Sequence, residues 1–117
     1  MEIDKTTYQV SGTKTPQTKE KIRLKLRLLL NNYKKCEIGI TSFTNISKKA
    51  FYLGEAGFKH FVVIYKSNSK DSVTHYLDTF KAMYRNEVKV LAEDDTDKAP
   101  TKPFVLFIVG RSKKRVF

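Results

Sequence analysis

The chain of 117 residues has one cysteine, no tryptophan, three prolines and five glycines, and it has no long apolar run. A membrane-spanning helix needs about 20 consecutive apolar residues, so no span is predicted. The single Cys36 cannot form an internal disulfide, which fits a reducing compartment. Residues 1–4 lack the charged-then-apolar order of a signal peptide. We therefore expect an intracellular protein, in the cytoplasm or nucleus, without a membrane partner.

Several chemistries also lack their sequence signatures. The chain contains no CxxC, HExxH, P-loop or GxGxxG motif, so zinc, nucleotide and dinucleotide sites have no support and no cofactor is expected. The length suits one domain with an ordinary core. Eight phenylalanines and six tyrosines can fill that core without metals or disulfides. No internal repeat is visible.

Positive charge is in large excess. The formal net charge is +11, and residues 103–117 carry four cations and no acid. Such a surplus concentrates polyanions near the protein and indicates nucleic acid first, with an acidic protein as the next partner class. The alternative interpretation is that a lysine-rich surface only keeps a small protein soluble.

Three regions are predicted along the chain. Residues 1–18 are rich in Thr, Lys and Gln and are expected to form a flexible basic arm. Residues 19–111 form the domain, and 112–117 form a basic tail. Within the domain, residues 19–32 alternate apolar and basic side chains as a strand would, but Leu, Lys and Arg are good helix formers. The cap-like start at Thr15-Pro16 favours a helix, and the strand stays as the alternative.

The remaining elements are clearer. The helix after Ser69 has an unbroken i, i+3, i+4, i+7 apolar stripe. Polar residues 93–102 are expected to form a solvent-exposed loop. Strands are predicted at 36–43, 59–66 and 103–110, and helices at 45–55 and 69–85. This alternation predicts an α/β (α+β) fold, with a small central sheet and helices packed on it.

One glycine stands inside a predicted strand, in Cys36-Glu37-Ile38-Gly39-Ile40-Thr41. Glycine weakens a strand, so it usually marks a close approach of another group. Together with Phe61–Lys66 and Pro103–Val109, this IGIT segment resembles the second half-motif of the GIY-YIG nuclease superfamily, over residues 19–111. The resemblance implies a sheet with packed helices and a connection to nucleic acid.

The resemblance also implies catalytic positions, and the chain departs from them. Members pair tyrosines with a helix arginine and a metal-binding glutamate. Here Glu37 falls in a tyrosine position, Lys48 and Lys49 in the arginine position, and Leu77 or Asp78 in the glutamate position. An active enzyme would use Tyr65, Lys48 and Asp78, with Asp78 as a weak ligand for Mg²⁺ or Mn²⁺. Lysine does not reproduce the bidentate grip of arginine on phosphate.

Three other residues are candidates for a chemical site. His75 shares a helical face with Asp71 and Asp78, a pattern that could orient a general base but is more typical of a surface ion pair. His60 is interpreted as an edge residue of its strand. Cys36 at a strand start is typical of a buried, inert thiol.

The basic residues carry the strongest functional indication. Tyr33 and Phe43 could add stacking surface. The predicted nucleic-acid-binding residues are Lys34, Lys35, Gly39, Lys48, Lys49, Arg111, Lys113, Lys114 and Arg115. We expect a domain that binds DNA or RNA and whose nuclease activity is lost or altered. The alternatives are a divergent metal-dependent endonuclease and a protein-interaction module for an acidic partner, marked by exposed Leu24 and Leu28.

Overall fold

A computed structural model of the protein describes residues 1–92 and 100–114. Its elements, in chain order, are β1 (Glu2–Asp4), β2 (Val10–Ser11), α1 (Pro16–Asn32), β3 (Tyr33–Lys34), β4 (Cys36–Ser42), α2 (Ile46–Glu55), β5 (His60–Ser67), α3 (Lys70–Met83), β6 (Val88–Val90), β7 (Phe104–Gly110) and β8 (Ser112–Lys113). A 3-10 turn, Phe43–Asn45, joins β4 to α2. Within the described ranges no helix is long and apolar enough to cross a membrane.

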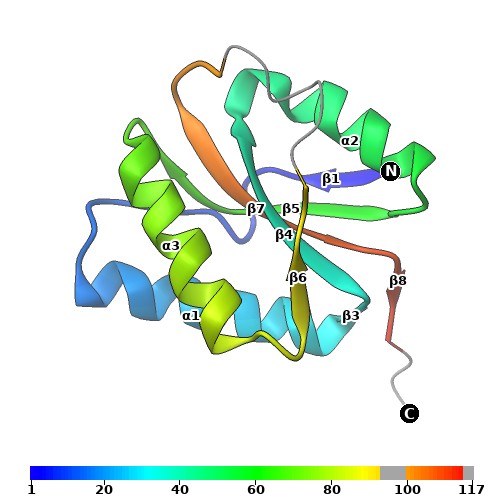
Figure 1. Ribbon diagram of the computed structural model, residues 1–117, viewed down its shortest axis with the longest axis horizontal. Helices are drawn as coiled ribbons and strands as arrows, with labels where there is room; N and C mark the ends of the chain where they lie inside the picture. The colour runs from blue at the N-terminus through cyan, green and yellow to red at the C-terminus, as the bar shows by residue number, and fades with distance from the viewer. Residues whose placement is uncertain (93–99, 115–117) are drawn as a thin grey trace.

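The main sheet is mixed and has six strands. Its order is β1-β5-β7-β4-β6, and β2 also pairs with β5. β7 runs antiparallel between β4 and β5 (Figure 1). β4 and β5 therefore run in the same direction. Parallel strands need a crossover connection, and α2 provides it between β4 and β5. β6 is parallel to β4, and β1 and β2 are parallel to β5.

The central strand β7 contributes to both halves of the core. Phe104, Leu106 and Ile108 pack in the cluster with α1 and α3, whereas the alternate residues of β7 pack in the cluster with α2. A strand covered on both faces has a continuous apolar sequence, as β7 has. The fold is thus a small α+β domain with helices packed on a central sheet, as predicted, and α1 and α3 lie on one face of the sheet while α2 lies on the other.

Residues 19–32 are helical, so the preferred prediction is confirmed and the strand alternative is wrong. The helix begins at Pro16, after Thr15, whose side chain accepts a hydrogen bond from the backbone N–H of Thr18. The buried apolar residues of α1 follow a helical spacing, although apolar and basic residues also alternate along this segment. They are Ile22, Leu26, Leu29 and Leu30. The high helix propensity of Leu, Lys and Arg and the N-cap at Thr15 favour the helix over the strand.

The first eighteen residues differ from the predicted flexible arm. β1 and β2 pair with β5, and Val10 is buried in the core. Tyr65 donates a hydrogen bond of 2.6 Å to the carbonyl of Gly12. The reason is that β5 would otherwise present an unpaired edge, which these short strands cover.

The other predicted elements agree with the structure to within a few residues, and the short strands β3, β6 and β8 were missed in addition to β1 and β2. β6 has only Val88, Lys89 and Val90, too short to give a periodic pattern. Ser69 caps α3 by accepting from the N–H of Ser72. The predicted loop at 93–102 lies mostly outside the described residues, and so do residues 115–117 of the predicted tail.

Candidate nucleic-acid interface

A second, two-stranded sheet lies at the end of the molecule where β4 begins. Tyr33 pairs with Lys113 and Lys34 with Ser112 in the antiparallel β3–β8 pair. Lys35 follows with a positive φ of 52° and turns the chain into β4. A Cβ on Gly110 would lie 2.8 Å from the Cβ of Tyr33, so this close crossing of the two segments requires a glycine.

We name this pair and its flanking cations the basic ribbon. It consists of Lys34, Lys35, Arg111, Lys113 and Lys114. Lys34 and Lys35 follow α1, whereas the other three cations follow β7. The β3–β8 pairing brings these two groups together. The side chains of Lys34, Lys35 and Lys113 are exposed and form no ion pair with any acid in the described part of the chain.

Two members of the basic ribbon hold it to the helices. Arg111 donates a hydrogen bond of 2.7 Å to the carbonyl of Ala56, and its guanidinium lies over the ring of Phe58 at 4.2 Å. Lys114 donates a 2.8 Å hydrogen bond to the carbonyl of Leu30. Both cations lie at helix C-termini, where the backbone carbonyls are unpaired and the dipole favours positive charge. Arg111 and Lys114 therefore have structural roles in addition to their charge.

The lysine pair of α2 does not join this ribbon. Lys48 and Lys49 lie near the start of α2, after the opposite end of β4. The seven residues of β4 span roughly 20 Å at about 3.3 Å per residue. Lys48 is exposed, but Lys49 is only 2% exposed and belongs to the buried face of α2. The two predicted pairs thus do not flank one face, and Lys49 is not a surface phosphate contact.

Gly39 is also buried, and its role is in packing. A Cβ at this position would lie 2.9 Å from Cζ of Phe107 and 3.1 Å from Cδ1 of Leu91. The ring of Phe107 stacks on that of Phe61 at 4.3 Å between centroids. The predicted close approach is present, but it is made by an aromatic side chain, and Gly39 lies away from the basic ribbon.

A pocket of about 280 Å³ lies at the carboxyl end of β4. Its polar lining is Thr41, Ser42, Asn45, Lys49, Lys70 and Thr74, and none of its described lining residues is acidic. Thr41 is 4% exposed, and its hydroxyl has no hydrogen-bond partner among the described residues. The starts of α2 and α3 both reach this pocket, so its electrostatics favour an anion over a cation.

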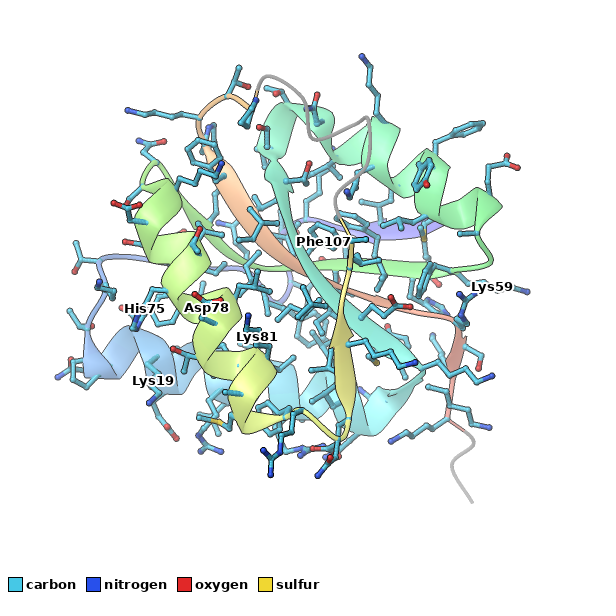
Figure 2. All side chains as sticks on the ribbon, viewed as in Figure 1. Lys19, Lys59, His75, Asp78, Lys81 and Phe107 are labelled. Carbon is cyan, nitrogen blue, oxygen red and sulfur yellow. The ribbon has the colours of Figure 1, made fainter. Side chains whose placement is uncertain are left out.

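The residues of the predicted catalytic set do not converge. Tyr65 is fully buried in the cluster with α1 and α3, because a bulge between Val63 and Tyr65 turns it to that face. Lys48 lies on α2, on the other face of the sheet. Asp78 is exposed and forms an ion pair of 3.3 Å with Lys81 (Figure 2). None of the three catalytic candidates lines the pocket at the end of β4.

The other chemical candidates are surface or buried groups without a catalytic arrangement. His75 is exposed on α3 and its ring contacts that of Tyr76, with no ion pair to Asp71 or Asp78. Burial raises the pKa of the Cys36 thiol to about 11, which leaves it protonated at neutral pH. Among the described residues no group of three or more His, Cys, Asp or Glu side chains could hold a metal ion.

The predicted stacking residues are engaged within the molecule. The ring of Tyr33 stacks on that of His60 at 4.6 Å, and the ammonium of Lys66 lies 3.9 Å from the ring centre of Phe43. Sequence reasoning missed the aromatic side chains that are open to solvent, Phe51 and Tyr52 of α2. Their helical positions relative to buried Ile46, Ala50 and Leu53 could have indicated this exposure.

The chain matches no protein-family model, no curated protein sequence and no solved structure. The resemblance to the GIY-YIG superfamily therefore stays a prediction.

Proposed function

We propose that the protein binds nucleic acid by contacting phosphates with its basic ribbon. The observation that carries this proposal is the β3–β8 pairing, which brings the exposed Lys34, Lys35 and Lys113 together in one small ribbon, with Lys34 and Lys113 on its opposite faces. Three exposed ammonium groups without acidic partners suit a polyanion, and the net charge of +11 adds long-range attraction. Contacts of this kind position a nucleic acid and carry little base specificity.

The test is a binding titration with labelled DNA and RNA, in single-stranded, duplex and branched forms, between about 50 and 200 mM salt. Affinity should fall steeply over this range because phosphate contacts release counterions. A triple variant, Lys34→Gln with Lys35→Gln and Lys113→Gln, should bind weakly. The slope of log affinity against log salt should flatten by about 2 to 3 units, since each phosphate contact contributes about 0.7 to 0.9.

A matched control removes the same charge elsewhere. Lys14, Lys19 and Lys21 are exposed near or at the start of α1, and changing all three to Gln gives the same net charge as the ribbon variant. This control should keep most of the affinity and the wild-type salt slope. Absence of binding to every probe at low salt contradicts the proposal. Equal losses in the two triple variants would also contradict it, because binding would then depend on net charge alone.

A specific observation favours a second candidate, a protein-interaction module. Leu24 and Leu28 are 51% and 52% exposed one turn apart on the outer face of α1. Lys21 and Lys25 lie beside them on the helix, which suits an acidic partner with an apolar face. Affinity capture with the wild-type protein should then retain a partner that Leu24→Ser with Leu28→Ser loses and that the ribbon variant keeps.

A further inference from the structure

The outer face of α2 carries the most exposed aromatic ring among the described residues. Phe51 is 73% exposed and Tyr52 is 51% exposed, whereas Ile46, Ala50 and Leu53 of the same helix are buried. Both residues thus stay more than half exposed in the described fold. An exposed aromatic side chain offers a flat face on which another ring can stack.

A shallow groove of about 610 Å³ runs from Phe51 to the start of β5. Its lining includes Phe51, Lys59 and His60. His60 stacks on Tyr33, the first residue of β3 and thus of the strand that carries Lys34. The backbone N–H of Lys59 also bonds to the carbonyl of Gly110, just before Arg111, and Figure 2 labels Lys59 at this end of the molecule. The groove and the basic ribbon are therefore neighbouring parts of one surface.

Arg111 fixes the distance between the groove and the basic ribbon. Its hydrogen bond to Ala56 ties the end of α2 to the segment that continues into β8. Tyr52 lies one turn before Ala56, whose N–H bonds to the Tyr52 carbonyl. The exposed aromatic residues and the exposed lysines are thus held on one rigid framework and are not on independently moving segments.

The charges divide the surface into two parts. The groove also contains Glu2 and Glu55, and a carboxylate oxygen of Glu2 lies 3.1 Å from Nδ1 of His60. These two acids offset the charge of Lys59 in the groove, whereas the exposed Lys34, Lys35 and Lys113 attract phosphates to the ribbon. An uncharged base against Phe51 in the groove, with its phosphates on the ribbon, satisfies both parts, and Tyr52 offers a second exposed ring on the same helix outside the groove.

We infer that the protein prefers single-stranded nucleic acid, with unpaired bases stacking on Phe51 and Tyr52 while the basic ribbon contacts the phosphates. In a duplex the base faces are stacked on one another, so only unpaired bases can use an aromatic platform. Combined aromatic and cationic contacts are how proteins hold single strands without reading sequence. This inference rests on the proposed function. It adds that the bound nucleic acid is single-stranded and names the residues on which its bases stack.

The test uses single-stranded oligonucleotides of about 12 nucleotides and duplexes of the same length, both fluorescently labelled. The variant is Phe51→Ser with Tyr52→Ser, and the control is Leu24→Ser with Leu28→Ser, which removes a comparable exposed apolar pair from α1. The aromatic variant should lose about tenfold or more in single-strand affinity, with an unchanged salt slope and unchanged duplex affinity. The control should bind as the wild type does.

A second readout uses the absence of tryptophan from the chain. Phe51→Trp places one tryptophan at the proposed stacking position, and its fluorescence should be quenched by the single strand and not by the duplex. Light scattering on the aromatic variant reports whether these rings instead hold two copies together.

The outcomes separate this inference from the proposed function. If the protein binds single strands and duplexes equally well and the aromatic variant behaves as wild type, the inference fails while the proposed function stands. If no probe binds at low salt, both fail. A change of oligomeric state in the aromatic variant without a loss of single-strand affinity would also overturn the inference.

Discussion

The ring of Phe107 fills the space in which residue 39 would carry a side chain. Gly39 and Phe107 are paired across β4 and β7, and a Cβ on Gly39 would approach Cζ of the ring to 2.9 Å. The ring cannot retreat freely because it stacks on Phe61 at 4.3 Å. The glycine in the IGIT segment is thus explained by core packing on the face that α2 covers.

This relationship predicts that Gly39→Ala destabilises the protein by about 1 to 3 kcal/mol, the usual cost of overpacking a core. The control is Gly54→Ala in α2, where the nearest atom to a new Cβ is 3.8 Å away. Alanine should stabilise the helix there by about 0.5 to 1 kcal/mol. Urea unfolding of both variants measures the difference. A Gly39→Ala protein as stable as the wild type would show that Phe107 is not confined as described.

Arg111 is predicted to matter more for stability than its neighbour Lys113. Arg111→Ala removes the hydrogen bond to Ala56 and the contact with the ring of Phe58, at a cost of about 1 to 2 kcal/mol. Lys113→Ala should change stability by less than about 0.5 kcal/mol, because its side chain is exposed. Thermal unfolding of the two variants tests this, and equal shifts in Tm would contradict the anchoring role of Arg111.

The Cys36 thiol is predicted to react slowly in the folded protein. It is 3% exposed, and burial raises its pKa to about 11 from an ordinary value of 9.0, so little thiolate is present at pH 8. A thiol reagent should label native protein far more slowly than protein unfolded in urea. Equal labelling rates in the two states would contradict this prediction.

The same shift has a consequence for stability at high pH. The pKa of Cys36 is higher in the folded protein than in the unfolded chain, so the protonated thiol contributes fully to the free energy of unfolding below about pH 9. This contribution is lost as the pH rises toward 11, because the thiol of the unfolded chain releases its proton first. Comparison of the wild type with Cys36→Ala isolates this part of the pH dependence, since lysines and tyrosines titrate in both proteins.

Elements with strong local patterns could be predicted from the sequence. α3 has an unbroken apolar stripe and a serine cap, and β7 is a continuous apolar run, so both follow from local rules. β1, β2 and β6 could not be predicted in this way. Each has two or three residues, and they exist because a longer neighbouring strand offers an edge with which to pair.

The candidate site was predicted in its residue types and not in its geometry. The lysines at 34, 35 and 113 were identified from charge, but their union depends on a pairing between distant segments that no local signal reveals. Lys49 was misplaced for a reason visible in the sequence. With Ile46, Ala50 and Leu53 it follows the i, i+3, i+4, i+7 pattern, so it lies on the buried face of α2 despite its charge.

The last prediction concerns cleavage, and we expect nuclease activity near background. Tyr65 is buried with its hydroxyl bonded to Gly12, Lys48 lies across the sheet, and Asp78 is ion-paired with Lys81 on the surface. Charge stabilisation at a phosphoryl transition state needs groups aimed at one position, and the loss of a single such contact commonly costs about 10² to 10³ in rate. Lysine also lacks the planar bidentate grip on phosphate that arginine provides.

Incubation of purified protein with labelled DNA and RNA, with Mg²⁺ or Mn²⁺ and with chelator, measures this activity on the same probes that report binding. We expect binding without products in every lane. Cleavage that stops with chelator and disappears in Asp78→Ala or Lys48→Ala would contradict the prediction. It would mean that these side chains meet in a conformation other than the one described, because the sheet separates Lys48 from Tyr65 in the present fold.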